Sequence, residues 1–427
     1  MSHMSPHSHS RHFTIFLTMP ANHGAVVTGS RNLQNLVEVK SIPYPQLEDN
    51  AIIVKTIAYA VNPSDWKHIL LESFVSQVSS EVTKKFGFGI GLLERPLGCL
   101  GSNIGWFIGK NLTFARRGVV LGCDVSGVVE AVGTKVTGFS KGDIVSTSVH
   151  GAMSKNGAFS EFVSTTPNAT IKYPPSQLLQ KPLSPGEYPS STIDSFEGAA
   201  SISMGLTTVG LSLHCNLAIP LNKAENKDDY ILIWGGATAT GILAIQVAKL
   251  IYGIRVITTA SLRNHSLLLS LGADHVFDYN DENVVQKIKE VGKGNIKYGY
   301  DCVAATETFQ AVYDATEGPE EVRLENLLFL TEKSITTKPN RKVKCSSANA
   351  YLVDGKRHMG MKALPDVIES YLVYWNDLLP PILGQIKTAP LQVLSPGLLS
   401  ANEGLRLLIE NKVSGRKVVF RKGDESD

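Results

Sequence analysis

The sequence has almost no excess charge of either sign. Its 41 lysines and arginines face 39 aspartates and glutamates, a formal net charge of +2, so no overall positive field would attract nucleic acid. It also lacks an apolar run of about 18 residues, the length that a membrane-spanning helix needs. With 427 residues, 43% of them hydrophobic, the chain has enough apolar material for a large core and two domains. We therefore expect a globular protein that neither binds nucleic acid nor crosses a membrane.

Paired cysteines are absent as well. The five cysteines form neither a C-x-x-C pair nor an even disulfide framework; they are Cys99, Cys123, Cys215, Cys302 and Cys345. This spacing excludes a four-cysteine zinc lobe and fits a reducing compartment, so a cytoplasmic location is expected.

The first 18 residues hold four of the eleven histidines and no acidic residue. Their opening letters, MSHM, resemble what remains after tag cleavage. Residues 1–18 are therefore interpreted as a disordered tail or tag remnant, with a metal site as the weaker alternative, and they are left out of the fold prediction.

The rest of the chain changes its pattern once. Residues 19–204 alternate short apolar runs with proline, glycine and charged residues, as the strands of a mainly β domain do. From 205 to 350, buried-strand runs such as YILIWGG alternate with helical runs such as ILAIQVAKL, the spacing of βαβ units around a parallel sheet. Residues 351–427 end in one helix and one strand, too little for a third domain, so we expect them to return to the first. The predicted fold class is α/β: a mainly β domain plus a Rossmann-type, doubly wound parallel-sheet domain.

One segment fits neither period. Residues 70–117 mix glycine with Phe, Trp, Ile and Leu, and long connections of this kind are usually functional or disordered. The apolar content favours a lid over a bulky substrate, a partner surface or a membrane-surface patch over disorder.

A strand-to-helix turn at Ile233–Leu250 carries the clearest chemical signal. A phosphate loop needs small residues and free backbone N–H groups at a helix N-terminus. The turn supplies Gly236, Ala237, Thr238, Ala239, Thr240 and Gly241. Its pattern, G-x-T-x-x-G, lacks the middle glycine of the dinucleotide fingerprint. A plain strand-to-helix turn therefore remains the alternative. If the turn is a cofactor loop, the backbone of Thr238 should lie beside a pyrophosphate, and its hydroxyl could make a further contact.

The end of the second strand indicates which dinucleotide would bind. An NAD site presents a carboxylate about 20 residues after the loop, whereas this chain has Ser261 followed by Arg263. A hydroxyl and a guanidinium can bind a 2′-phosphate that a carboxylate would repel. The expected cofactor is NADPH, with Tyr279 at the same sheet edge; a simple surface charge is the alternative for Arg263.

The motifs together resemble a known family. VNPSDWKH, LGCDVSGVVEAVG, GDIV, NGAFSEFV, GLTTVG, WGGATATG, LGADHVFDY, DCV and SGRKVVF follow one another in an order similar to that of the medium-chain dehydrogenase/reductase superfamily. More closely, they resemble its zinc-free fungal branch of ToxD-like oxidoreductases and trans-acting polyketide enoyl reductases. The resemblance covers residues 19–427 apart from 70–117. It implies a discontinuous GroES-like catalytic domain packed on a Rossmann domain, with NADPH in the cleft between them.

The resemblance also allows a test for zinc. Zinc-dependent relatives carry G-H-E where this chain has Gly122-Cys123-Asp124, and a catalytic cysteine where it has Asn62-Pro63-Ser64-Asp65. One soft ligand and an aspartate do not make a three-ligand open site. No catalytic metal is expected, and Cys123 is interpreted as a buried apolar residue rather than a reactive thiol.

By resemblance, several side chains are expected around the nicotinamide. Those on the turn that faces it are Asn62, Ser64 and Lys67; those near its ribose are Thr207, Thr208, Cys302 and Val303; Lys417 would reach the cofactor or close the cleft. Asn62 and Lys67 are the candidate catalytic donors. A purely structural role remains the alternative for Asn62 as a turn, Thr207 as a cap and Lys417 as a surface cation.

The sequence thus predicts an NADPH-dependent reductase that acts without zinc on an activated C=C bond (enoyl or enone) or a quinone. Its substrate would be a small molecule or a carrier-bound unsaturated carbonyl, and the resemblance allows a homodimer. The alternative function is a catalytically quiet family member that binds a protein or membrane through residues 70–117.

Overall fold

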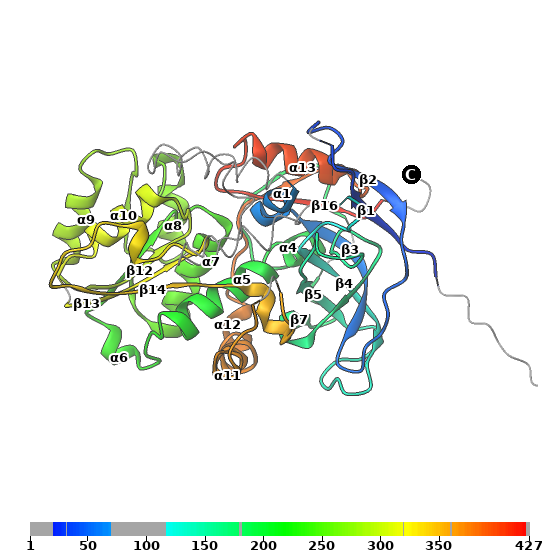
Figure 1. The fold of residues 1–427 in the computed structure, drawn as a ribbon, viewed down its shortest axis with the longest axis horizontal. Helices are drawn as coiled ribbons and strands as arrows, with labels where there is room; N and C mark the ends of the chain where they lie inside the picture. Colours follow the sequence, from blue (N-terminus) through cyan, green and yellow to red (C-terminus); the bar gives the residue numbers. More distant parts are fainter. Residues whose placement is uncertain are drawn as a thin grey trace, which may run out of the picture.

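A computed structural model describes residues 20–30, 32–69, 117–178, 182–318, 320–358 and 361–423. The predicted tail at 1–18 lies outside these residues, and so does the apolar segment at 70–117 apart from Arg117. The lid, partner and membrane-contact interpretations of that segment therefore stay predictions. The described chain forms two lobes side by side (Figure 1).

The β lobe is built on a sheet of eight strands in which most neighbours are antiparallel. The order along it is β7-β5-β4-β3-β16-β15-β8, and β6 also pairs with β3. Its strands are β3 (Ile52–Ala60), β4 (Asp124–Val132), β5 (Ile144–Ser148), β6 (Phe162–Thr165), β7 (Thr170–Tyr173), β8 (Gly186–Tyr188), β15 (Leu391–Val393) and β16 (Lys417–Arg421), and a separate hairpin joins β1 (His23–Val27) to β2 (Val37–Ser41). Strand β3 is an almost continuous apolar run and is nearly all buried, as a strand covered on both faces should be.

The α/β lobe is a six-stranded sheet in which every neighbouring pair is parallel. Its order is β11-β10-β9-β12-β13-β14, the doubly wound arrangement in which ligands bind where the strand order reverses, at the carboxyl ends of β9 and β12. Its strands are β9 (Tyr230–Trp234), β10 (Arg255–Thr259), β11 (His275–Phe277), β12 (Ile296–Asp301), β13 (Glu321–Asn326) and β14 (Lys342–Ser347). The predicted α/β class with a parallel Rossmann sheet is confirmed.

Helices cover both faces of the parallel sheet. α7 (Ala239–Val247) and α8 (His265–Ser270) join one apolar core, and α9 (Val284–Gly292) and α10 (Thr306–Ala315) join another on the opposite side. The remaining helical turns of this half are α6 (Lys223–Asn226), η4 (Ala248–Tyr252), η5 (Leu262–Asn264) and η6 (Glu332–Ser334).

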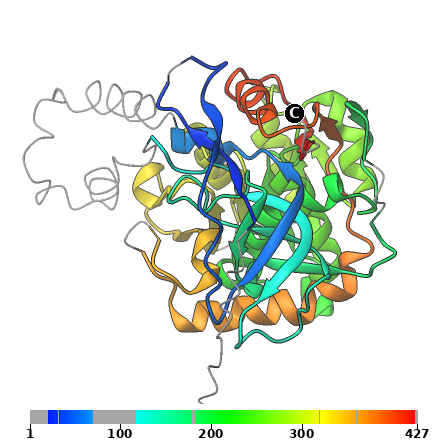
Figure 2. The same ribbon diagram turned by 90° about the vertical axis from the view of Figure 1, so that its right-hand side faces the viewer.

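Short helices link the lobes, and the chain returns from the α/β lobe in two steps. α4 (Phe196–Ala200), α5 (Ser203–Val209) and η3 (Gly210–Asn216) lead across, and α11 (Pro365–Val373), η8 (Tyr374–Leu378) and α12 (Pro380–Leu383) follow later. Since α11 and η8 contact η3, this part of 351–427 lies against the linking helices, seen in orange below the sheet in Figure 2. β15, β16 and α13 (Ser400–Ile409) then go back to the β lobe, where α13 contacts α1 (Pro63–Ile69). Two short turns complete the fold, η2 (Pro167–Ala169) and η7 (Ala350–Asp354).

Among the residues described, no helix combines the length and the apolar character needed to cross a bilayer.

Candidate functional site

The turn after β9 is shaped by three glycines. Gly235 has a φ of +82°, which glycine adopts without strain. A Cβ atom on Gly236 would lie 2.1 Å from Thr258 Oγ1, and one on Gly241 would lie 2.5 Å from the Gly235 carbonyl oxygen. The loop is therefore pressed against its own sheet and helix, and no larger residue fits at these positions without a shift.

Thr238 is the N-cap of α7. Its hydroxyl accepts a hydrogen bond from the Gly241 amide, at 2.9 Å, so the oxygen predicted as a further phosphate contact is already engaged in holding the helix start. Within the described chain, the amide groups of Ala237, Ala239 and Thr240 have no protein acceptor. The loop thus presents free N–H donors at a helix N-terminus, the arrangement that binds a phosphate.

The residues predicted to select the cofactor lie along one sheet edge. β10 and β11 are parallel neighbours with Thr259 opposite Phe277, which places Ser261 and Tyr279 just beyond the same edge. Arg263 is exposed on η5, and Tyr279 is 48% exposed. The Ser261 hydroxyl accepts from Asn264 Nδ2 at 3.2 Å.

The end of β12 lies against the loop. The Cys302 amide donates to the Trp234 carbonyl at 3.0 Å, and its thiol is hydrogen-bonded to Thr238. Burial raises the pKa of the Cys302 thiol far above its usual value. Val303 is 46% exposed beside Gly235. The structure therefore brings together the residues predicted from the ends of β9 and β12.

A buried polar centre forms where the β lobe meets the linking helices. The Lys417 ammonium donates to Asn62 Oδ1 and to Asp124 Oδ2, the latter at 3.3 Å. Asn62 Nδ2 donates to Asp124 Oδ2 at 2.9 Å, and the Met204 amide donates to Asp124 Oδ1 at 2.7 Å. Burial raises the pKa of the Asp124 carboxyl, and the Lys417 ammonium opposes that rise. Lys417 is only 4% exposed, so it is a member of this centre and not a surface cation.

This geometry bears on the two predicted donors. Both ends of the Asn62 side-chain amide are taken by protein partners, so in this arrangement it braces Lys417 and Asp124. Lys67 lies one turn further along α1, half-buried, with its ammonium 5.8 Å from the centre of the Trp66 ring. Burial lowers the pKa of Lys67.

A second cluster lies beside the centre. Asp65 is fully buried, and its Oδ2 accepts from the Asn62 amide at 2.7 Å. Burial raises its pKa to about 7. The Cys123 thiol contacts Asp65, lies 3.7 Å from the Ser64 hydroxyl and is 3.4 Å from the Tyr351 hydroxyl. Burial holds the pKa of Cys123 well above its usual range, so the thiol stays protonated.

By the resemblance given above, these residues correspond to the metal-binding positions of zinc-dependent relatives, but their donor chemistry is unlike that of a zinc site. Zinc binds deprotonated thiolates, imidazoles and carboxylates, whereas Cys123 is a protonated thiol and Asp124 is paired with the Lys417 ammonium. In the described part of the chain, no group of three or more His, Cys, Asp or Glu side chains could hold a metal ion.

The two predicted threonines diverge. Thr207 is fully buried and accepts from the Tyr371 hydroxyl at 3.4 Å. Thr208 is half-buried, and its hydroxyl donates back to the Met204 carbonyl at 2.7 Å. Thr208 is therefore the less buried of the two.

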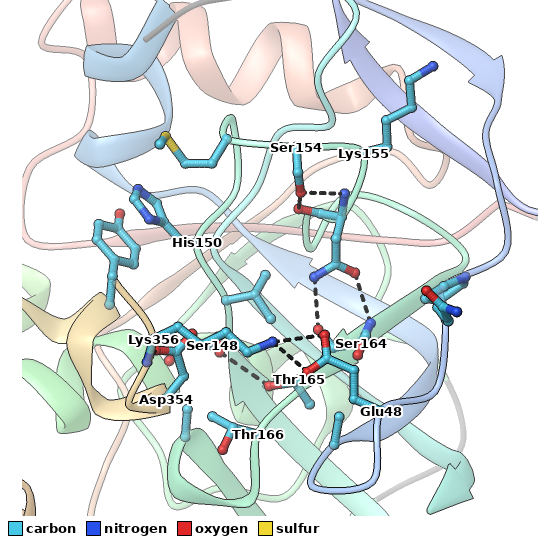
Figure 3. A pocket seen from close by; sticks show the side chains of 18 of the residues that line it. Glu48, Ser148, His150, Ser154, Lys155, Ser164, Thr165, Thr166, Asp354 and Lys356 are labelled. Atoms are coloured by element: carbon cyan, nitrogen blue, oxygen red, sulfur yellow. Dashed lines mark hydrogen bonds and ion pairs between the residues drawn. The ribbon is translucent and has the colours of Figure 1, made fainter. Parts of the chain in front are cut away.

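Sequence reasoning missed a pocket of about 670 Å³ next to the Cys123 cluster. His150, Tyr351 and His358 line it, and a Lys356–Glu48 ion pair at 2.8 Å crosses it (Figure 3). The signal available was weak: seven histidines lie outside the tail, and the two that line the pocket, His150 and His358, are 208 residues apart in sequence.

Family models match two parts of the chain. The GroES-like domain of alcohol dehydrogenases matches residues 98–175, and the zinc-binding dehydrogenase model matches residues 239–318.

Curated relatives match along nearly the whole length. The uncharacterized protein YNL134C of Saccharomyces cerevisiae is 31% identical over 89% of this chain and 93% of its own. The trans-enoyl reductase ACTTS2 of Alternaria alternata is 32% identical over 91% of this chain and 96% of its own. Among solved structures, mycobacterial Rv1454c complexed with NADPH has a TM-score of 0.58 at 21% identity, covering 94% of this chain and 99% of that one.

Proposed function

Because this chain belongs to the medium-chain dehydrogenase/reductase superfamily, in the branch of the fungal trans-enoyl reductases, we propose that it is an NADPH-dependent, zinc-independent reductase of an activated C=C bond or a quinone. The observation that carries the proposal is the loop at Gly235–Gly241. It presents free amides at a helix N-terminus, at the point of the sheet where the strand order reverses.

The preference for NADPH is supported by the edge beyond β10 and β11. Arg263 offers a guanidinium and Ser261 a hydroxyl, and both are suited to a 2′-phosphate. The NADPH in the mycobacterial structure of the same fold is consistent with this assignment. Tyr279 lies at the same edge and is exposed enough to stack on the adenine or contact the phosphate.

The catalytic side of the cleft would be formed by residues from both lobes. When bound, a reduced nicotinamide supplies a hydride to the substrate carbon conjugated with a carbonyl. Cys302, Val303 and Thr208 would lie along the nicotinamide ribose. The Asn62–Asp124–Lys417 centre would keep the turn before α1 rigid beneath the ring, so that the substrate is oriented without a metal.

Zinc independence is supported by the donors themselves. A metal in this place would have to displace the Lys417 ammonium from Asp124 and remove the proton from the Cys123 thiol, whose pKa burial has raised.

The test is cofactor oxidation with a panel of enones, enoyl thioesters and quinones, with NADPH and NADH compared. We expect turnover with NADPH and at least tenfold weaker use of NADH. Arg263→Ala should weaken NADPH binding by about 10–100-fold, since a hydrogen bond to a charged group contributes about 1.5–3 kcal/mol, and leave NADH binding unchanged.

Arg406→Ala is the matched control, because Arg406 pairs with Glu410 on α13 in the β lobe. It should bind both cofactors as the parent chain does. Failure of the parent chain to bind either cofactor would overturn the proposal, and activity that is lost on dialysis against a chelator and restored by zinc would overturn its zinc-independent part.

A further inference from the structure

Three histidines from distant parts of the chain meet beside the pocket, at the place where Figure 3 labels His150. His68 belongs to α1, His150 follows β5, and His358 follows η7. The His150 ring stacks on the Tyr351 ring with centroids 3.7 Å apart and an angle of 9° between the planes. The centroid of the His150 ring also lies 5.4 Å from that of His68 and 4.9 Å from that of His358.

Two of these imidazoles form a hydrogen-bonded chain with a carboxylate. Asp354 Oδ2 lies 2.7 Å from His358 Nε2, and His358 Nδ1 lies 2.9 Å from His150 Nδ1. One of the two Nδ1 atoms must carry the proton and the other must accept it. Whether His150 carries its proton on Nδ1 or on Nε2 therefore depends on whether His358 Nδ1 is protonated.

The far end of this chain has no protein partner. Within the described residues, His150 Nε2 is buried and has no hydrogen bond. Buried polar atoms are nearly always paired, so the atom is suited to a ligand. His150 also lies next to the candidate centre, because the amide of Val149 donates to the Cys123 carbonyl at 2.9 Å.

The surroundings keep His150 neutral. Burial lowers its pKa to about 2, with His68 and His358 adding to the effect, and burial lowers the pKa of His68 to about 4. From η7, Tyr351 faces His150 with its ring, and its hydroxyl contacts Cys123 beside Asp65. The Lys356–Glu48 pair is a further charged group of the pocket. Of the two hydrogen-bonded imidazoles, His358 is the one that also contacts a carboxylate, that of Asp354.

We propose that His150 is the catalytic acid of the reduction: its Nε2–H delivers the proton that the reduced substrate needs, and His358, held by Asp354, replaces it. The inference rests on the proposed function and identifies its substrate as an unsaturated carbonyl whose α-carbon, or whose oxygen in a quinone, takes up a proton at this nitrogen.

The protons and electrons balance. Hydride addition to the β-carbon moves an electron pair onto the carbonyl and leaves an enolate. The Nε2–H bond of His150 breaks and a C–H bond forms at the α-carbon. As that bond breaks, the His358 Nδ1 proton passes to His150 Nδ1, so both imidazoles are neutral at the end and His358 Nε2–H donates to Asp354. Solvent returns one proton to His358 after each turnover.

The first experiment reads the tautomers without any substrate. The apo chain is labelled with ¹⁵N-histidine, and the ring nitrogens are followed by two-bond ¹H–¹⁵N correlation across pH 5–9. We expect His150 to be the Nδ1–H tautomer where His358 accepts at Nδ1, and the neutral Nε2–H tautomer where His358 Nδ1 carries a proton. In Asp354→Asn the share of the His150 Nε2–H tautomer should fall, because the carboxylate that favours a doubly protonated His358 is gone. A His150 tautomer that does not follow His358 would overturn the relay, whether or not the chain is a reductase.

The second experiment is kinetic. His150→Gln should lower turnover about 100-fold or more, as the loss of a general acid does, with NADPH affinity within twofold of the parent chain. Asp354→Asn should move the pH profile of turnover in the same direction as the tautomer change. The control His275→Gln alters a histidine at the amino end of β11, away from the pocket, and should leave both readouts unchanged. Turnover of His150→Gln within twofold of the parent would contradict the proposal, whereas a parent chain that reduces nothing would contradict the proposed function.

Discussion

Lys417 is a residue whose environment in the structure differs from the one that its local sequence suggests. On the chain it is one basic residue in an exposed-looking SGRKVVF segment, but the fold buries its ammonium between Asn62 and Asp124. A buried pair of this kind contributes little net stability, yet removing one partner leaves an uncompensated charge.

Lys417→Met tests that electrostatic account. The substitution should lower the free energy of unfolding by about 3–5 kcal/mol, because Asp124 is left buried and unpaired, and urea denaturation measures it. The double variant Lys417→Met/Asp124→Asn should recover part of the loss, since the remaining amide can still accept from Met204. A double variant less stable than Lys417→Met alone would show that the charge is not the cause.

Asp65 predicts a pH dependence of stability. Burial raises its folded-state pKa from 3.8 to about 7, so the folded chain holds a proton that the unfolded chain has lost between these values. The resulting stabilisation is complete below about pH 4 and disappears as the pH rises through 7.

Asp65→Asn should remove this dependence. The unfolding free energy of the variant minus that of the parent should be greater at pH 8 than at pH 5, by about 1–3 kcal/mol, as measured by urea denaturation at both values. His68 titrates with the opposite sign, but it is present in both chains and cancels in the difference. A difference that does not vary with pH would contradict the assignment.

Among the secondary-structure elements, the loop between β9 and α7 is the one whose sequence motif bears most directly on the proposed cofactor site. The missing middle glycine of its fingerprint is replaced by Thr238, which serves as the helix cap, and the close approaches are made by Gly235, Gly236 and Gly241. A threonine fits here because its side chain turns back to the helix and leaves the loop amides open.

Gly241→Ala should damage this element. Its Cβ would meet the Gly235 carbonyl oxygen at 2.5 Å, so the backbone must move, at about 1–3 kcal/mol of stability and at least a tenfold loss of NADPH affinity. Thermal unfolding and fluorescence titration measure the two effects. Gly384→Ala, at the end of α12 with a helical φ of −67° and open space around it, is the control and should match the parent chain. Unchanged cofactor binding in Gly241→Ala would argue against the loop as the phosphate site.

At the scale of the whole molecule, the β lobe is closed by residues from the end of the described chain. Strand β16 lies between β3 and β15, and it delivers Lys417 to the buried centre. The candidate site therefore depends on a contact between residues 355 positions apart in sequence.

Deletion of residues 414–427 should abolish folding of the β lobe, because β3 and β15 lose the strand between them and Asp124 loses its cation. Circular dichroism and limited proteolysis should show loss of a cooperative transition. A shorter deletion of residues 424–427 keeps β16 and should unfold as the full chain does. A stable, protease-resistant β lobe in the longer deletion would refute this dependence.

The sequence alone determined the parallel sheet and the loop. Helix and strand periods are local, and the glycines of a phosphate loop lie within seven consecutive residues, so both features can be read along the chain. The same local pattern placed Ser261, Arg263 and Tyr279 at one sheet edge.

Only the tertiary structure decided which polar residues meet. Asn62 and Lys417 were expected near the cofactor only by resemblance, and their contact with Asp124 arises because the antiparallel sheet brings β3, β4 and β16 together. The Asp354–His358–His150 chain likewise joins residues from distant parts of the chain. Such contacts are long-range, because the partners of a buried charge or imidazole are chosen by the packing of distant strands, and no periodicity in the sequence records that choice.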